Sequence, residues 1–232
     1  MIDRYSLTAS ASALAERFSV EVPAHYKPRY NAAPVQLLPA ITSTGRQGIS
    51  WFYWGRPPHF ARNKNLGEKI INLSVDTLKE KPMLQKTLLR HRCIIPADGF
   101  YGWKKVGKKL SIPHRFTTTD QKLFSFAGLW EEFEDEDESM VHAFTLITTQ
   151  SNSYIHPVTE RMPVILTKTM EDAWLDVRTP DRDLLALLQP YAASKMSMYT
   201  VSPRINNPAI DHASLIIPAP ASDQHGNLTL FD

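Results

Sequence analysis

The sequence predicts an α+β fold with a mainly antiparallel sheet and a few short helices. Most apolar runs are short, rich in β-branched and aromatic residues, and bounded by turn residues, which is the pattern of strands. Few segments carry apolar residues at helical spacing. The length of 232 residues allows one large domain or two small ones, and no repeat, low-complexity linker or clear boundary divides the chain.

The first 34 residues are predicted to form a strand, a helix and a loop. Residues 1–7 alternate as a short strand does. Ser10 is a good N-cap, and the apolar residues after it at i, i+3, i+4 and i+7 predict a helix that ends before Val22-Pro23. Three prolines give residues 23–34 the composition of a loop.

Residues 35–54 are predicted to form two strands joined by a turn between Gly45 and Gly48. Pro39 has no backbone N–H to donate, so it favours an edge position for the first of them. Residues 70–73 predict a further short strand, with Asn72 near its end. A helix or a helix-turn is expected over residues 77–90.

The segment 92–103 joins a buried strand to a tight turn and then to aromatic residues. Residues 93–95 form an apolar run, and Asp98-Gly99 is strong turn chemistry. Because sites are often built where strands end in turns, Phe100, Tyr101 and Trp103 are candidates for a site. The same pattern also fits a core strand followed by a hairpin.

The rest of the chain continues the α+β pattern. Strands are predicted over 110–117, 123–130, 143–148, 161–166 and 198–201. Thr169 is expected to cap one helix and Pro180 to open another. The acidic run 131–138 is expected to be a solvated hairpin loop, and residues 221–232 a mobile tail.

Composition restricts the classes of function. The formal charge of +2 is too small for a polyanion-binding tail, so a nucleic-acid surface would need a local cluster of cations. One cysteine permits no internal disulfide, and the histidines lack metal-ligand spacing. No signal-like or membrane-spanning apolar run is present. We therefore expect a cytoplasmic monomer with no membrane association, no metal and no cofactor.

Residues 54–69 form the most basic irregular segment. Cations and aromatics interleave there among prolines and glycines, a composition that can follow phosphates and stack on bases of single-stranded DNA. The candidates are Trp54, Arg56, Arg62 and Lys64. A solvated loop with ordinary surface charge is the alternative.

Several segments resemble, in order, the motifs of the SOS-response-associated peptidase (SRAP) family, also called the abasic-site-processing family. They are Arg4-Tyr5-Ser6-Leu7, Arg29-Tyr30-Asn31-Ala32-Ala33-Pro34, Ile71-Asn72, Arg92 to Trp103 with its Ile-Pro-Ala-Asp-Gly-Phe-Tyr block, His156 followed by Arg161-Met162-Pro163-Val164-Ile165-Leu166, and Val201-Ser202-Pro203 with Asn206.

The resemblance implies one domain over residues 1–220, with a partly barrel-like, mainly antiparallel sheet flanked by helices. It also implies binding of single-stranded DNA in a basic groove and capture of abasic sites. In the family, a cysteine after the initiator Met supplies an amine and a thiol, which close a thiazolidine ring on the sugar aldehyde. An Asn, a Glu and a His assist.

This chain departs from that pattern at two of the four positions. Ile2 replaces the cysteine and has no thiol, and its bulk should discourage removal of Met1. Gly102 stands where the family has the glutamate. Asn72 and His156 match. Cys93 lies in a buried strand pattern, where a thiol is usually inert, although a Cys93–His156 pair is conceivable.

The matching residues have chemistry suited to the implied site. Neutral His156 can act as acid or base, and Asn72 can orient the sugar or the chain start, although either could be structural. Arg4 and Arg161 could contact phosphates or form ion pairs within the protein. The resemblance adds Asn31 and Pro34 to the predicted DNA-binding residues.

Two functions from different classes remain. One is an abasic-DNA sensor with residual Schiff-base or lyase chemistry through the N-terminal amine and His156. The other is a homologue that binds single-stranded or abasic DNA without covalent chemistry, so that stable cross-linking is lost. A peptidase is a third reading, with little support from the residues.

Replacing Arg4 or Arg56 by alanine should weaken binding to single-stranded DNA and reduce its salt dependence, because phosphate contacts release counterions. Affinities measured for an oligonucleotide over a range of salt concentrations test this. Each lost contact should reduce the slope of log K against log salt by about 0.7. Unchanged affinity and slope would return both residues to ordinary surface or structural roles.

Overall fold

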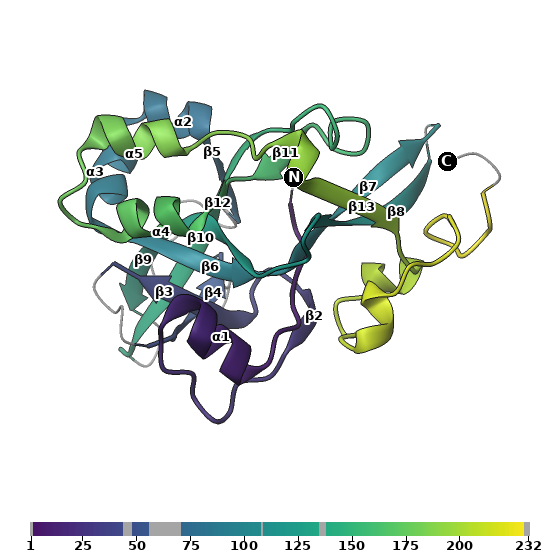
Figure 1. The fold of residues 1–232 in the computed structure, drawn as a ribbon, viewed down its shortest axis with the longest axis horizontal. Helices are drawn as coiled ribbons and strands as arrows, with labels where there is room; N and C mark the ends of the chain where they lie inside the picture. The colour runs from purple at the N-terminus through teal and green to yellow at the C-terminus, as the bar shows by residue number, and fades with distance from the viewer. Residues whose placement is uncertain (1, 44–47, 56–70, 108, 135–137, 230–232) are drawn as a thin grey trace.

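Two sheets form the framework of the computed structural model, which describes residues 2–43, 48–55, 71–107, 109–134 and 138–229 (Figure 1). The first sheet has five strands and the second has eight. In the first the order is β13 (Met196–Thr200), β8 (Leu110–Thr118), β7 (Gly99–Val106), β1 (Tyr5–Leu7) and β2 (Arg29–Ala32).

The second sheet closes on itself. Its path runs through β11 (Arg161–Pro163), β10 (Met140–Gln150), β4 (Ser50–Trp54), β3 (Leu37–Thr42), β6 (Arg92–Ala97), β9 (Phe124–Glu134) and β12 (Ile165–Leu166), and β5 (Asn72–Ser74) pairs with β10. Because β9 also pairs with β10, the five strands β10, β4, β3, β6 and β9 complete a ring. The fold is therefore α+β, with a mainly antiparallel sheet that forms a partial barrel, as the sequence predicted.

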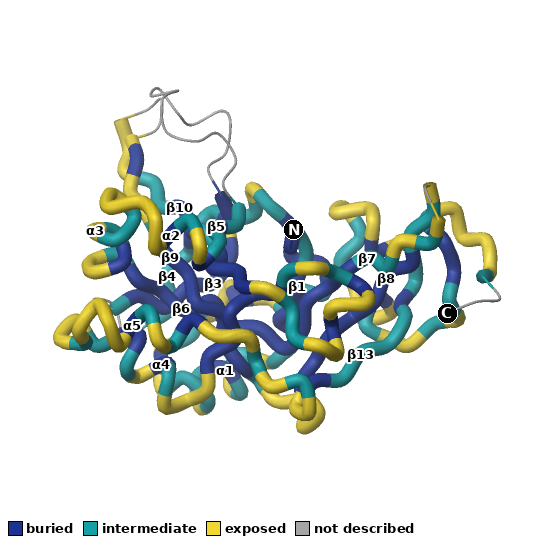
Figure 2. Tube along the Cα trace, turned by 90° about the horizontal axis from the view of Figure 1, so that it is seen from above, coloured by how far each residue is buried: buried dark blue, intermediate teal, exposed yellow. Residues whose placement is uncertain are grey.

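Aromatic side chains connect the two sheets. Tyr5 of β1 packs edge-on against Trp54 and Phe126 of the barrel, with ring centroids 5.3 and 5.8 Å apart. Phe100 of β7 also meets Phe126. All four residues belong to the main core cluster, and the buried trace runs through both sheets in Figure 2. The chain thus folds as a single domain.

In the described part of the chain, five α-helices flank the barrel: α1 (Ala11–Phe18), α2 (Val75–Glu80), α3 (Pro82–Arg90), α4 (Lys168–Leu175) and α5 (Asp181–Leu187). The last four contribute to a second core cluster with the outward side chains of the barrel. Three short 3-10 helices follow in the C-terminal part: η2 (Ala193–Lys195), η3 (Pro203–Asn206) and η4 (Ala213–Ile216). Figure 1 shows the α2–α5 group beside the barrel and the η3–η4 region at the other end.

Arg92 fixes two of these helices to β6. Its side chain is buried, and its guanidinium donates to the carbonyls of Leu88, Leu89, Trp174 and Asp176. These carbonyls belong to the ends of α3 and α4, where backbone oxygens lack helical partners and carry partial negative charge. A buried cation at this point therefore satisfies acceptors that would otherwise be unpaired.

Asp98 lies where the chain leaves the barrel and enters the first sheet. β6 ends at Ala97 and β7 begins at Gly99. The Asp98 carboxylate accepts from Ser6 Oγ at 2.7 Å, from Thr8 Oγ1 at 2.7 Å and from the Thr8 backbone N–H. Arg115 Nη2 pairs with it at 2.8 Å. One buried carboxylate thus joins β1, the crossover and β8.

Several elements differ from those that the sequence predicted. The expected loop 23–34 contains β2, because residues 29–32 pair with β1. The expected helix 77–90 is two helices, because Pro82 has no N–H to continue α2. Thr167, rather than Thr169, caps α4. Ser10 caps α1 as predicted, through a hydrogen bond from Ala13 N.

The edge position expected for Pro39 holds only locally. β3 lies between β4 and β6, so the strand as a whole is internal. Its residues 37–40 pair with β4 alone, and pairing with β6 begins at Ile41. The side of Pro39 that faces β6 therefore has no strand partner, so its missing N–H costs no hydrogen bond to that strand.

Replacing Asp98 by asparagine should destabilise the fold by about 3–5 kcal/mol, because it leaves the Arg115 charge buried without its partner. Asp120→Asn is the matched control, since Asp120 pairs with Lys122 on an exposed turn and its loss should cost less than about 1 kcal/mol. Urea unfolding of both variants measures the difference. Equal losses of stability in the two variants would show that the Asp98–Arg115 pair stabilises the fold no more than an exposed ion pair does.

Candidate functional site

Asn72 and the start of the chain come together at one place. Asn72 opens β5, which lies parallel to β10 with Asn72 opposite Leu146. Its Nδ2 donates to the Ile2 carbonyl at 2.6 Å. Ile2 itself is fully buried in the main core cluster. Positions 2 and 72, two of the four matched to the family, are therefore joined by a hydrogen bond. Position 2 carries an aliphatic side chain where the family has a cysteine.

Gly102 lies beside the same segment. In the β1–β7 ladder Tyr5 is opposite Phe100, and a further hydrogen bond from Tyr101 N to the Arg4 carbonyl, 3.1 Å long, continues the pairing. Gly102 follows Tyr101 directly, so it comes next after the last hydrogen bond that joins β7 to the N-terminal segment. A third matched position thus adjoins the chain start.

Little room exists for a side chain at Gly102. A Cβ there would be 2.9 Å from Phe116 Cε2 and 3.3 Å from Thr159 Cγ2. Phe116 is fully buried and stacks on Phe100, with centroids 4.9 Å apart. The phenyl ring therefore occupies the space that a longer residue at position 102 would need.

His156 lies in the turn that leads to Thr159, whose Cγ2 would be 3.3 Å from a Cβ at Gly102, and no hydrogen bond joins it to Asn72 among the described residues. Its backbone N–H donates to Asn152 O at 3.0 Å, and Asn152 Oδ1 accepts from Tyr154 N and Ile155 N. Ile155 is fully buried and anchors the turn. The His156 side chain is exposed and makes no hydrogen bond within the described part of the chain. It is free to meet a bound molecule.

Some of the buried polar atoms that lack a hydrogen-bond partner lie beside the chain start. Asp3 Oδ1, Arg4 Nε and Asn72 Oδ1 are buried and have no hydrogen-bond partner among the described residues. Buried polar atoms are paired in most proteins, so such atoms often mark a ligand site. Burial raises the pKa of Asp3 and outweighs the opposing effect of the Arg4 charge. The segment is therefore equipped to accept and donate hydrogen bonds.

The two arginines matched to the family have partners within the protein. Arg4 Nη1 donates to the Asp3 carbonyl at 2.9 Å, and its side chain is 13% exposed. Arg161 donates to Thr148 Oγ1 and Thr148 O, and lies 3.6 Å from Asp76. Both side chains reach the surface in part, so a role in phosphate binding stays a prediction.

Asn31 fastens the C-terminal segment. It is fully buried, and its Nδ2 donates to the carbonyls of Ile205, Asn207 and Ile210. Asp211 accepts from Arg29 and from two backbone N–H groups of β2. In this structure Asn31 therefore has a structural position, with no side-chain surface for DNA.

The other predicted DNA-binding residues divide into three cases. Trp54 is fully buried, donates to the Ile71 carbonyl and stacks on Phe144, which leaves no ring face for a base. Pro34 lies half-buried in the turn before β3. Arg56, Arg62 and Lys64 lie outside the described residues.

Cys93 has no access to solvent in this structure. It is fully buried in β6, and burial raises the pKa of its thiol far above the ordinary value. No hydrogen bond joins it to His156 in the described ranges. The prediction that Cys93 lies in a buried strand is confirmed.

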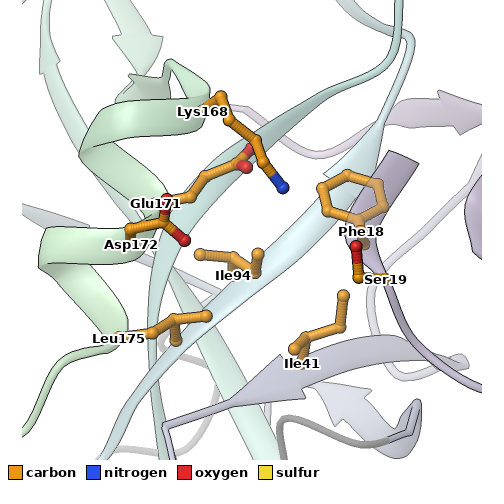
Figure 3. A pocket seen from close by; sticks show the side chains of 8 residues that line it. All are labelled: Phe18, Ser19, Ile41, Ile94, Lys168, Glu171, Asp172 and Leu175. Carbon is orange, nitrogen blue, oxygen red and sulfur yellow. The ribbon is translucent and has the colours of Figure 1, made fainter. Parts of the chain in front are cut away.

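Two cavities lie away from these residues. One, of about 270 Å³, opens between the end of α1 and α4, where Lys168, Glu171 and Asp172 face Phe18, Ile41 and Ile94 (Figure 3). The other, of about 520 Å³, adjoins the Asp98–Arg115 pair and Tyr199. Neither is lined by a predicted site residue. Within the described ranges no group of His, Cys, Asp or Glu could hold a metal ion.

Asp3 was missed by sequence reasoning. Nothing in its neighbours distinguishes it from a surface carboxylate, and the burial of its Oδ1 arises only in the folded chain. The one available signal was its place next to Ile2.

A family model described as SOS response associated peptidase (SRAP) matches residues 1–208. The chain belongs to the SRAP family. Among the curated SRAP relatives, the abasic site processing protein YoqW of Bacillus subtilis is 38% identical over 221 residues, which cover 93% of this chain and 99% of the relative. YoaM, from the same organism and also named an abasic site processing protein, is 35% identical over 93% of this chain and 97% of its own.

A solved structure confirms the SRAP fold. A protein from Bacteroides thetaiotaomicron superposes with a TM-score of 0.82 at 25% identity, over 93% of this chain and 99% of its own. No helix in the described ranges is long and apolar enough to cross a membrane.

Placing alanine at Gly102 should cost about 1–3 kcal/mol of stability, because the Cβ would press on a buried phenyl ring. Phe116→Leu should relieve this, so the double variant should lose less than the two single variants together. Gly48→Ala serves as the control, since the nearest atom to a Cβ there is 3.9 Å away. Denaturant unfolding measures the stability of each variant. An unchanged stability for Gly102→Ala would mean that the Phe116 ring can move aside without cost.

Proposed function

We propose that this protein binds single-stranded DNA at abasic sites as a monomer in the cytoplasmic DNA damage response, without forming a stable thiazolidine cross-link. The observation that carries the proposal is the Asn72–Ile2 hydrogen bond. It fixes the chain start at the matched site, where a side chain without sulfur takes the place of the thiol. The names of the curated relatives support abasic-site DNA as the partner.

The missing thiol limits the covalent chemistry. An aldehyde that condenses with an amine gives an imine, which water reverses. A neighbouring thiolate can add to the imine carbon and close a stable ring, but the sec-butyl group of Ile2 cannot. The product that remains available to this site is therefore reversible.

A second candidate function is transient Schiff-base formation followed by strand cleavage. The unpaired Oδ1 atoms of Asn72 and Asp3 favour it, because they leave hydrogen-bond acceptors beside the chain start for the N-terminal amine and for a sugar hydroxyl. Exposed His156 can supply or remove a proton. In a protein that starts at Met1, the reacting amine belongs to that residue.

Incubation with a single-stranded oligonucleotide that contains an abasic site tests both functions. We expect no heat-stable adduct on a denaturing gel, because no thiol can lock the imine. An adduct that forms only with borohydride, or strand cleavage, would support the second function. A heat-stable adduct without reductant would contradict the proposal, and absence of binding would overturn both.

A restored site sharpens this test. Ile2→Cys with Gly102→Glu supplies the missing thiol and carboxylate, and Phe116→Leu makes room for the glutamate. We expect this triple variant to gain a heat-stable adduct once mass spectrometry confirms that Met1 is removed. The matched control carries Ile2→Ser with the same two other changes, and it should gain none.

A further inference from the structure

We propose that Val35 is a DNA contact residue whose side chain covers the face of a nucleobase next to the abasic site. This contact raises the affinity for abasic single strands above that for intact ones. It deepens the binding function proposed above and rests on it, and no covalent step is involved. The backbone conformation, the exposure and the position of Val35 each support the assignment.

Val35 has a backbone conformation that valine rarely adopts. Its φ of 59° lies in the left-handed region, where a β-branched residue is a clear outlier. It is the third residue of the turn 33–36, with Pro34 before it and a hydrogen bond of 3.3 Å from Gln36 N to the Ala33 carbonyl. A type II turn has this arrangement and normally carries glycine or asparagine at the third position. Valine therefore strains the turn.

Hydrogen bonds to the end of β4 hold the turn in this shape. Val35 N donates to the Trp54 carbonyl at 2.9 Å, and Trp54 N donates to the Gln36 carbonyl at 3.1 Å. Gln36 Oε1 also accepts from Ala33 N at 3.1 Å. Strained residues persist only where the surrounding structure imposes their conformation, and they occur preferentially at ligand-binding and active sites. The strain at Val35 therefore points to a role beyond the turn itself.

The fold gains little from the Val35 side chain. It is 47% exposed, and it belongs to none of the hydrophobic clusters formed by the described residues. Leu37, two residues further on, is 41% exposed. A single exposed apolar side chain is ordinary on a protein surface. An exposed β-branched side chain on a strained backbone is not, because neither burial nor local conformation favours it.

The turn leaves the first sheet at the same end as the chain start. β2 ends at Ala32, which pairs with Tyr5, and Tyr5 is the first residue of β1. Trp54, which holds the turn, also donates its indole N–H to the Ile71 carbonyl at 2.9 Å. Asn72 follows Ile71 directly. One residue of β4 therefore connects the strained turn with the segment that carries the matched asparagine.

An abasic site uncovers apolar surface that a valine side chain can cover. Each base beside the missing one loses a stacking partner, so one of its aromatic faces becomes open to water. DNA-binding proteins place aliphatic side chains against unstacked bases, and unstacking is easiest where the DNA is damaged. Val35 offers neither charge nor a side-chain hydrogen bond to a phosphate. The base face that the lesion uncovers is therefore the partner that it fits.

Val35→Gly is the decisive variant, because glycine adopts the left-handed conformation without strain and has no side chain. We expect its affinity for a single-stranded oligonucleotide with a reduced, unreactive abasic site to fall at least about fivefold, since an apolar contact is lost. Its affinity for the same oligonucleotide without the lesion should change less than about twofold. The slope of log K against log salt should not change, because no phosphate contact is removed.

Protein stability separates a DNA contact from a packing role. The melting temperature of Val35→Gly should hold or rise, because the strain that is relieved offsets the greater freedom of glycine in the unfolded chain. Gln121→Gly is the matched control, since Gln121 has a φ of 52° on the exposed connection between β8 and β9. It should leave both DNA affinities unchanged. Val35→Ile keeps an apolar β-branched side chain and should retain the wild-type affinities.

The outcomes distinguish this contact from the proposed function. Wild-type affinity in Val35→Gly, or a clear fall in its melting temperature, would overturn the contact and leave the proposed function standing. The same holds for an equal loss of affinity for abasic and intact strands, and for a loss in Val35→Ile as large as in Val35→Gly. A wild type that does not bind abasic DNA would overturn both.

Discussion

The Asp98–Arg115 pair is the constraint on which the rest of the structure depends. It sits where the chain crosses from the closed barrel to the five-stranded sheet, and its carboxylate also holds Ser6 and Thr8 of the N-terminal segment. Gly99 is required beside it, because a Cβ there would lie 2.8 Å from Arg115 Nε. Since the pair fixes β1 against β7, it also sets the direction in which residues 2–4 leave the sheet.

That direction produces the site. The N-terminal segment leaves β1 toward Asn72, and the register with β7 brings it beside Gly102. The two positions that depart from the family pattern have different surroundings. The Ile2 side chain is buried in the core, and the Phe116 ring occupies the space beside Gly102. Among the described residues, buried polar atoms without a hydrogen-bond partner include Asp3 Oδ1, Arg4 Nε and Asn72 Oδ1 beside the chain start, whereas position 2 carries no polar group.

Sequence reasoning found the elements whose signals are local. The helix at Ser10 and the strands around 92–103 follow from capping, periodicity and turn chemistry, and the motifs led to the correct family. It did not find β2, which lies in a proline-rich segment. The strand forms because its backbone pairs with β1, and the composition of the segment gives no sign of this pairing. Nor did it find that Trp54 is buried. The sequence pattern of an aromatic residue at a strand end is the same whether its ring packs in a core or contacts a ligand.

The sequence by itself determined the family, the α+β class and the absence of a thiol at position 2, because these depend on residue identity and order. Only the tertiary structure decided which residues share the site. Asn72 and Ile2 are far apart in the chain, and one amide hydrogen bond joins them, while the pairing of β1 with β7 brings the N-terminal segment beside residues 99–101. Such proximity arises from long-range strand pairing, which leaves no trace in the spacing of residues.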